Sequence, residues 1–154
     1  MRTNLAIADL GDLLDRPILA VLATRRSDET TMLSPVWFEW DGEAVVIWTG
    51  GPDDGKARHL AADPRTTVVI AESDLPYRGL EVTGRAELTG EGFDSAIRRI
   101  SARYVGAATA ETLARGFPDG LLIRVIPDRI RAWDFEDDYG DLARAQSLEA
   151  RQEV

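Results

Sequence analysis

The feature that most constrains the fold is a hairpin pattern centred on Asp41-Gly42. Two segments rich in β-branched and aromatic residues flank this dipeptide, TMLSPVWFEW before it and EAVVIWTG after it. Asp-Gly readily adopts the positive φ angles of a two-residue hairpin turn, so the pattern predicts two antiparallel strands. The fold is therefore expected to be built around this strand pair.

Four further segments have strand patterns: PILAVLATR (17–25), RTTVVIAES (65–73), GLEVTGRAELT (79–89) and GLLIRVIPDRIRAWDF (120–135). The last is expected to be interrupted near Pro127, because proline cannot donate a ladder hydrogen bond. Six strands with mostly hairpin connections are too many for one flat sheet, and closure into a barrel removes exposed edges. Residues 1–135 are thus predicted to form one mainly β domain, a six-stranded barrel with peripheral helices.

Helical spacing of apolar residues predicts helices at 4–14, 91–105 and 107–115. A short helix is also expected behind Asp53 or Asp54, either of which can cap it, and Asp63-Pro64 should end it. The charged C-terminal tail, residues 136–154, is expected to be frayed or to pack weakly on a partner.

Composition excludes several classes of function. The net charge of −9 argues against nucleic-acid binding, and no apolar run approaches the roughly 20 residues that span a membrane. Acidic residues within the first apolar stretch are unlike a signal peptide, so a cytoplasmic protein is expected. The chain has no cysteine and one histidine, so no metal site is predicted. No serine has a nucleophile-elbow context, which disfavours hydrolase chemistry.

The stretch TGGPDDGKARHLAADPR (49–65) contains the only lysine, Lys56, and the only histidine, His59. A lysine in the first turn of a helix is electrostatically misplaced, because the helix N-terminus is already partly positive. Lys56 can pair with Asp53 or Asp54 in a purely structural helix. Alternatively, it can bind a phosphate or carboxylate together with the free N–H groups of the helix, where nearby glycines leave room for a ligand: Gly50, Gly51 and Gly55. His59 is interpreted as a solvated residue on the helix surface.

The second informative stretch is SPVWFEW (34–40). Pro35 marks a bulge or an unpaired edge, where backbone groups become available to a ligand. Trp37 and Trp40 lie here, and Trp48 lies on the expected hairpin partner. These rings can pack in the core, or they can form a flat apolar wall for an aromatic ligand.

Taken in order, four segments carry a resemblance to a known group of proteins: AVLAT (20–24), SPVWFEWDGEAVVIWT, KARHLAADPRTTVVI and PYRGLEVTGRAEL. The chain resembles the split β-barrel flavin/deazaflavin oxidoreductase superfamily from about Pro17 to Trp133. This superfamily includes the pyridoxamine 5'-phosphate oxidase-like proteins, and the branch that uses the deazaflavin coenzyme F420 is the more similar one. The resemblance implies an FMN-binding type of split barrel that forms a homodimer with two cofactor sites at the subunit interface.

By this resemblance, Lys56 would hold the cofactor phosphate, helped by the N-terminal end of its helix and by Thr49, Gly50 and Gly55. The backbone from Ser34 through Pro35 and Val36 to Trp37 would lie along the deazaflavin ring. Arg58 would lie near the phosphate or the acidic oligoglutamate tail, and Arg78 could come from the second subunit. Family members often carry asparagine in place of His59, which therefore gains no role.

The function implied is that of an F420-dependent reductase, transferring hydride from the reduced deazaflavin to a small organic substrate. An FMN-binding oxidase or reductase of the same fold is the first alternative, and a non-enzymatic cofactor-binding protein is the second. No catalytic residue is assigned. The candidate proton donors are Tyr77, Arg78 and solvent.

Overall fold

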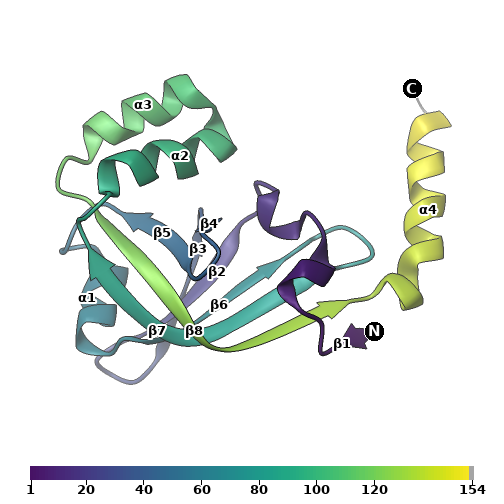
Figure 1. Ribbon diagram of the computed structural model, residues 1–154, viewed down its shortest axis with the longest axis horizontal. Helices are drawn as coiled ribbons and strands as arrows, with labels where there is room; N and C mark the ends of the chain where they lie inside the picture. The colour runs from purple at the N-terminus through teal and green to yellow at the C-terminus, as the bar shows by residue number, and fades with distance from the viewer. Residues whose placement is uncertain (153–154) are drawn as a thin grey trace.

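The computed structural model describes residues 1–152 and shows a curled antiparallel sheet flanked by helices (Figure 1). This confirms the mainly β prediction with peripheral helices. The strands follow the order β3-β2-β6-β7-β8-β5-β4, with β1 added to β8. The prediction of six strands is too low, because β1 was not expected and because the segment 31–40 divides into two strands. The eight strands are β1 (Arg2–Thr3), β2 (Ala20–Arg25), β3 (Thr31–Val36), β4 (Glu39–Trp40), β5 (Val45–Thr49), β6 (Arg65–Ala71), β7 (Gly79–Thr89) and β8 (Leu121–Asp134).

The short connection between β3 and β4 links the two edges of the curled sheet. These strands lie at opposite ends of the strand order, yet only Trp37 and Phe38 separate them in the chain. The predicted hairpin is therefore corrected, because β3 pairs with β2 and only Glu39–Trp40 pairs with β5. Alternation of apolar residues continues through this crossing and gave no sign of a change of partner.

The hairpin turn itself also lies one residue later than predicted. Glu39 pairs with Val46 and Trp40 with Val45, and the N–H of Asp41 donates to the carbonyl of Ala44. The Asp41 side chain accepts hydrogen bonds from two backbone N–H groups further along the turn, at 2.9 and 2.8 Å. Gly42 has a φ angle of +99°, which favours glycine at this position. The aspartate thus stabilises the turn from its edge instead of forming its centre.

Three of the predicted helices are confirmed as α1 (Gly55–Ala62), α2 (Phe93–Val105) and α3 (Ala107–Gly116). Asp54 caps α1 and Asp63 ends it, as expected from the residues. The segment 4–14 is different, because it forms two 3₁₀ turns, Ile7–Leu10 and Leu13–Asp15, instead of one α-helix. Gly11, between them, has a φ angle of +59°, so the chain cannot continue as a right-handed helix there.

The C-terminal residues form a fourth helix, α4 (Glu136–Gln152), where a tail that is frayed or packs weakly on a partner was expected. Figure 1 shows α4 to one side of the sheet, beginning near the N-terminus. Its first turn is tied to the body by the pairing of the Met1 amino group with Asp138 and by the Tyr139 ring, which packs on Phe135 and Tyr77. No helix within residues 1–152 combines the length and the apolar character needed to cross a membrane.

The buried side chains form two clusters. One fills the inside of the curled sheet and includes Phe38, Ile47 and Ile123, and the other lies where α2 and α3 cover the sheet and includes Ile97 and Ile100. The pairing of the long strands β7 and β8 changes register at one point, because Gly84 pairs with Pro127 whereas the preceding residue, Thr83, pairs with Arg129. The irregularity expected near Pro127 is thus a bulge in the pairing, while β8 itself continues from Leu121 to Asp134 without a break.

Candidate functional site

A cavity of about 490 Å³ lies where the ends of β3 and β5 meet the beginning of α1. It brings together six of the ten residues predicted as cofactor-binding: Lys56, Thr49, Gly50, Pro35, Val36 and Trp37. Its remaining lining residues are Leu19, Trp48, Asp54 and Phe117. Two stretches that were singled out separately in the sequence, 34–40 and 49–65, thus both contribute residues to the lining of one site.

The polar end of the cavity is the N-terminus of α1. The Asp54 side chain accepts a hydrogen bond from the backbone N–H of Lys56 at 2.9 Å and another from the Lys56 ammonium at 3.1 Å. Burial disfavours the charged form of Asp54, but these hydrogen bonds outweigh it and lower the pKa of the Asp54 carboxyl below its usual value. The structural pairing of Lys56 is therefore present. It uses one of the three ammonium donors, and the others remain for a ligand.

Thr49 lies beside this ion pair and is almost fully buried, with 2% of its surface exposed. Its hydroxyl is near enough to Asp54 to help lower the pKa of that carboxyl, but it has no hydrogen bond of acceptable geometry within residues 1–152. Leaving a buried hydroxyl without a partner costs about 1–3 kcal/mol. An unpaired hydroxyl in the wall of a cavity beside an ammonium group is thus an indication of a polar ligand.

The other end of the cavity is aromatic. The Trp37 ring stacks on Tyr104 with a centroid separation of 5.0 Å and an angle of 6° between the rings. Trp48 meets Trp37 edge-on at 6.3 Å and contacts Phe117 at 5.2 Å. Trp37 and Trp48 line the cavity and also pack against the buried cluster below α2 and α3, so both roles considered for the tryptophans remain open for these two. Their rings are inclined at 67°, and Trp40 packs against the core of the sheet.

Phe117 was not predicted as a site residue from the sequence. Its position explains why a residue without a side chain stands at position 50. A Cβ atom at Gly50 would lie 3.2 Å from the Phe117 ring, so the absence of a side chain at Gly50 accommodates this ring. Gly50 was expected to leave room for a ligand, but the space beside it is bordered by Phe117 of the same chain. Phe117 follows α3 in a loop far from 49–65 in sequence, and no local pattern places it near the site.

Four predicted site residues lie outside this lining. Ser34 is half-buried on β3, and Gly55 begins α1, where an added Cβ would be 4.0 Å from Met32. Arg58 lines a separate cavity of about 590 Å³ with His59 and three other arginines: Arg25, Arg26 and Arg65. His59 itself is half-buried, with Nδ1 3.0 Å from the Thr24 hydroxyl, so it is less solvated than expected.

Arg78 is held by residues of its own chain. Its guanidinium donates to Glu72 at 2.9 and 2.6 Å and to the carbonyl of Leu10 at 2.8 Å, and it also pairs with Asp12. The hydrogen bond with Glu72 is the main reason why the pKa of Arg78 is raised further above its usual value, so this side chain stays charged.

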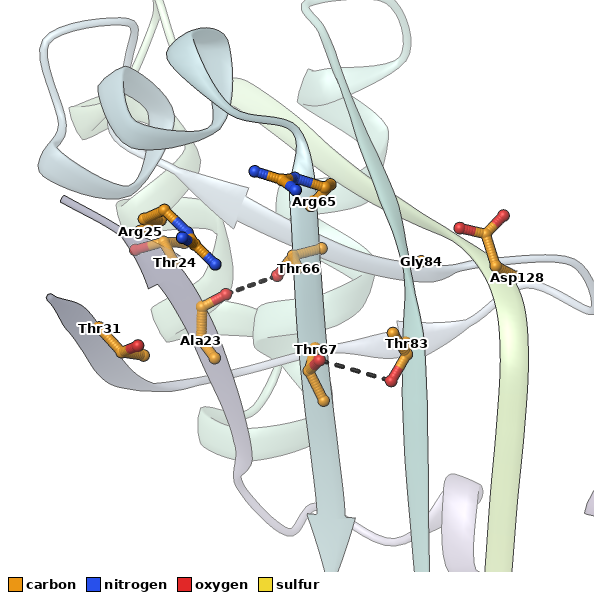
Figure 2. Close-up of a pocket in the computed structure, with 10 residues that line it drawn as sticks. All are labelled: Ala23, Thr24, Arg25, Thr31, Arg65, Thr66, Thr67, Thr83, Gly84 and Asp128. Carbon is orange, nitrogen blue, oxygen red and sulfur yellow. Dashed lines mark hydrogen bonds between the residues drawn. The ribbon is translucent and has the colours of Figure 1, made fainter. Parts of the chain in front are cut away.

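A third cavity, of about 320 Å³, lies on the outer face of β2, β6 and β7 (Figure 2). Threonines dominate its surface, and two of its polar contacts are internal: Thr66 donates to the carbonyl of Ala23 at 2.7 Å, and the hydroxyls of Thr67 and Thr83 are 3.4 Å apart. None of the ten predicted residues lines it. The cavity beside Lys56 is therefore the better candidate for the functional site.

The curled sheet with its peripheral helices defines a split barrel of the pyridoxamine 5'-phosphate oxidase-like type. The chain belongs to the pyridoxamine 5'-phosphate oxidase family, whose profile matches residues 8–134. The resemblance inferred from the sequence segments is thereby confirmed. The match ends before α4, so the C-terminal helix lies outside the shared domain.

Solved structures extend this relationship. A conserved hypothetical protein of Mycobacterium tuberculosis is 23% identical with a TM-score of 0.70, over 85% of this chain and 86% of that chain. An F420 reductase is 29% identical with a TM-score of 0.63, over 77% of this chain and 93% of its own. An FAD-binding protein of Mesorhizobium loti is 14% identical with a TM-score of 0.61, over 85% and 93%. No curated protein sequence matches the chain. The family match places the chain among the pyridoxamine 5'-phosphate oxidase-like split barrels. The F420 reductase and the FAD-binding protein share this fold.

Proposed function

We propose that this protein is an F420-dependent oxidoreductase that transfers a hydride between the reduced deazaflavin and a small organic substrate. The observation that carries the proposal is one cavity with two chemically different ends. Lys56 and the unpaired Thr49 hydroxyl form the polar end, and Trp37 and Trp48 form the aromatic end. A phosphorylated ring cofactor requires this combination, and the likeness to an F420 reductase at 29% identity favours the deazaflavin.

The polar end fits a phosphate for electrostatic reasons. The first N–H groups of an α-helix have no partners within the helix, and the helix dipole adds about half a positive charge at that end. The Lys56 ammonium increases this positive potential, which is unfavourable in the free protein and becomes favourable once an anion is bound. Asp54 competes with such an anion for the ammonium, so the bound phosphate would share Lys56 with Asp54.

The backbone of the edge strand β3 is suited to bind the polar edge of a cofactor ring. β3 lies at one end of the strand order, so the backbone groups along its outer side have no sheet partner. Pro35, Val36 and Trp37 line the cavity from this strand and the connection that follows it. Backbone donors and acceptors there would orient the ring, while Trp37, fixed by its stacking on Tyr104, covers its side.

When bound, the cofactor would supply the hydride chemistry, and the protein would supply orientation and exclusion of water. The residues offer no evident proton donor. Arg78 is held in its charged form by Glu72, so it is a poor source of a proton, and Tyr77 packs on Tyr139 at the start of α4. We therefore infer that any proton required for the reaction comes from solvent.

We further propose that the protein acts as a homodimer with the cofactor sites at the subunit interface. Leu19 lines the cavity and is 52% exposed, and Leu33, on β3, is 66% exposed. Val21, on the neighbouring strand β2, is also exposed. A second copy covering these apolar side chains would complete the wall of the cavity and remove them from water. Arg58 and Arg78 do not reach the cavity of their own chain, so any role for them in cofactor binding would be at the partner's site or on the cofactor's tail.

A flavin is the alternative cofactor, because the family is named for pyridoxamine 5'-phosphate oxidase and the phosphate end would suit FMN equally well. A non-enzymatic protein that sequesters the cofactor would bind it in the same cavity and show no turnover with any acceptor.

The test is a calorimetric titration of the full chain with F420 and with FMN separately, together with Lys56→Ala. We expect F420 to bind, and we expect Lys56→Ala to weaken its binding about tenfold or more, since a hydrogen bond to a charged group is lost. Arg115→Ala is the matched control, because it removes one positive charge from an exposed position on α3. Tight binding of FMN without binding of F420, together with no effect of Lys56→Ala, would contradict the proposal.

A further inference from the structure

Trp48 presents a buried hydrogen-bond donor that the cofactor proposal does not use. Within residues 1–152, three buried polar side-chain atoms have no hydrogen-bond partner: Nε1 of Trp48, Oγ1 of Thr49 and Oγ of Ser101. The first two belong to adjacent residues that both line the candidate site. Thr49 lies beside Lys56 and is assigned to the phosphate end. The indole N–H of Trp48 is left without a function, although buried tryptophans normally find an acceptor.

The neighbours of Trp48 explain why its N–H is unpaired. The ring lies between Trp37, at 6.3 Å, and Phe117, at 5.2 Å, and packs against the apolar cluster below α2 and α3. None of these aromatic side chains offers a carbonyl or carboxylate to an N–H donor. An acceptor for Trp48 must therefore be brought in from outside the described residues.

Phe117 is the side chain whose movement would admit such an acceptor. It is half-buried in the loop after α3, and its backbone N–H makes only a long contact, 3.4 Å, with the carbonyl of Ala114. Its ring lies against Gly50, which has no side chain to hold it in place. Trp37, by contrast, is fixed by its close stacking on Tyr104. A rotation of Phe117 would uncover the Trp48 ring without disturbing the sheet.

We propose that Trp48 N–H is the donor of a substrate subsite, opened by rotation of Phe117, that binds the oxygen of a neutral, planar carbonyl compound. Aromatic side chains favour contact with another aromatic ring, and an N–H group recognises only an acceptor. A neutral oxygen is favoured over a carboxylate because Lys56, the cation of this cavity, belongs to its other end. The subsite lies in the cavity proposed for the cofactor, where it would hold the substrate beside the cofactor ring. In this respect it rests on the proposed function.

The experiment compares two small bicyclic probes, 1-indanone and indane, which differ by one carbonyl oxygen. Binding of each to the full chain is measured by calorimetry for the wild type, Trp48→Phe and Phe117→Ala. The wild type should prefer 1-indanone, and Trp48→Phe should weaken 1-indanone binding about fivefold while leaving indane unchanged, because one hydrogen bond is lost and the aromatic ring is kept. Phe117→Ala should strengthen the binding of 1-indanone, because the covering ring is removed. Equal affinities of the two probes for the wild type, or an unchanged preference in Trp48→Phe, would overturn the proposal.

A measurement on the wild-type chain keeps the test valid if Trp48→Phe does not fold. Labelling with ¹⁵N-tryptophan gives one indole N–H signal for each of the four tryptophans, and single replacements at the other three assign the Trp48 signal. 1-Indanone should move the Trp48 N–H proton signal downfield, as formation of a hydrogen bond does, and indane should not. The same downfield change with both probes, or with neither, would overturn the subsite. Titration with F420 and FMN tests the cofactor proposal and the two indane probes test this subsite in the absence of cofactor, so a failure of one is distinguishable from a failure of the other.

Discussion

The backbone N–H of Phe38 donates a hydrogen bond to the side-chain hydroxyl of Tyr104, 3.2 Å away. The same hydroxyl donates to the carbonyl of Ile18 at 2.8 Å, and Arg103 donates to the carbonyl of Phe38. Phe38 lies in the crossing between β3 and β4, where the chain leaves one end of the strand order for the other. Two consecutive residues of α2 thus satisfy the backbone groups that the sheet leaves unpaired there, and the Tyr104 ring also supports Trp37 in the site.

Replacing Tyr104 by phenylalanine should therefore destabilise the fold without removing the ring that supports Trp37. The change leaves the N–H of Phe38 and the carbonyl of Ile18 without their partner, at a cost of about 1–3 kcal/mol in the free energy of unfolding. Urea denaturation measures this change. Tyr139→Phe, at an exposed position on α4, is the matched control and should stay within about 0.5 kcal/mol of the wild type. Equal effects of the two replacements would show that the crossing does not depend on Tyr104.

The bulge between β7 and β8 should be sensitive to a single methyl group at Gly84. A Cβ atom there would lie 1.9 Å from the carbonyl oxygen of Ile126, and backbone cannot move aside as a flexible side chain can. We expect Gly84→Ala to lower the free energy of unfolding by about 1–3 kcal/mol or more, measured in urea. Gly116→Ala, at the end of α3, is the control, since an added Cβ there meets nothing within 4 Å. A Gly84→Ala protein as stable as Gly116→Ala would contradict this account of the bulge.

The sequence allowed prediction of most elements, because their signals are local. Alternating apolar residues mark the strands, Asp54 and Pro64 mark the limits of α1, and Pro127 marks the bulge. The position of Lys56 in the first turn of a helix conflicts with the helix dipole and singled this residue out, although only the family resemblance favoured an anion site over a structural ion pair. In each case one short segment contains the whole physical reason.

The features that could not be predicted depend on contacts between distant segments. The change of partner at Trp37–Phe38 is supported by Arg103 and Tyr104 of α2, which lie 65 and 66 residues after Phe38. Phe117 reaches the site only because α2 and α3 fold back over β5. Arg58 is two residues from Lys56 but lines a different cavity, because side chains two positions apart on a helix point in different directions.

Glu72 should make the stability depend on pH. Burial disfavours its charged form, but the hydrogen bonds from Arg78 outweigh burial and lower the pKa of the carboxyl below its usual value of 4.5. A carboxylate whose pKa is lowered by folding stabilises the folded state above the unfolded pKa, and this stabilisation is lost as the pH falls through the folded pKa. Glu72→Gln should therefore be less stable than the wild type at pH 7, and the difference should shrink progressively below about pH 4. Urea unfolding between pH 7 and pH 3 measures both.

Glu91→Gln is the control for this pH dependence, because Glu91 is exposed and its carboxylate forms no ion pair within residues 1–152. It should leave the stability nearly unchanged at pH 7. A difference between the wild type and Glu72→Gln that stays constant over the whole pH range would show that the charge of Glu72 is not its source.

The proposed dimer predicts that Leu33→Glu will yield monomers. Leu33 is 66% exposed, so a charged side chain is tolerated in the isolated chain, but burying it in a subunit interface would be costly. Sedimentation velocity should show a dimer for the wild type and a monomer for Leu33→Glu, with little change in secondary structure. Leu148→Glu, at a similarly exposed position on α4, is the matched control and should remain dimeric. A monomeric wild type would refute the dimer.

The pairing of Lys56 with Asp54 predicts a variant that binds the anion better than the wild type. Asp54→Ser keeps an N-cap residue, so α1 should retain its stability to within about 1 kcal/mol. It removes the carboxylate that competes with a phosphate for the Lys56 ammonium, so the affinity for F420 should rise about three- to tenfold, measured by calorimetry. Asp53→Ser removes a neighbouring exposed charge that forms no bond to Lys56 within residues 1–152, and it therefore reports the general effect of charge. If both variants change the affinity equally, the Asp54 contact does not limit the availability of Lys56. If Asp54→Ser weakens binding, the carboxylate positions the ammonium for the ligand instead of competing with it.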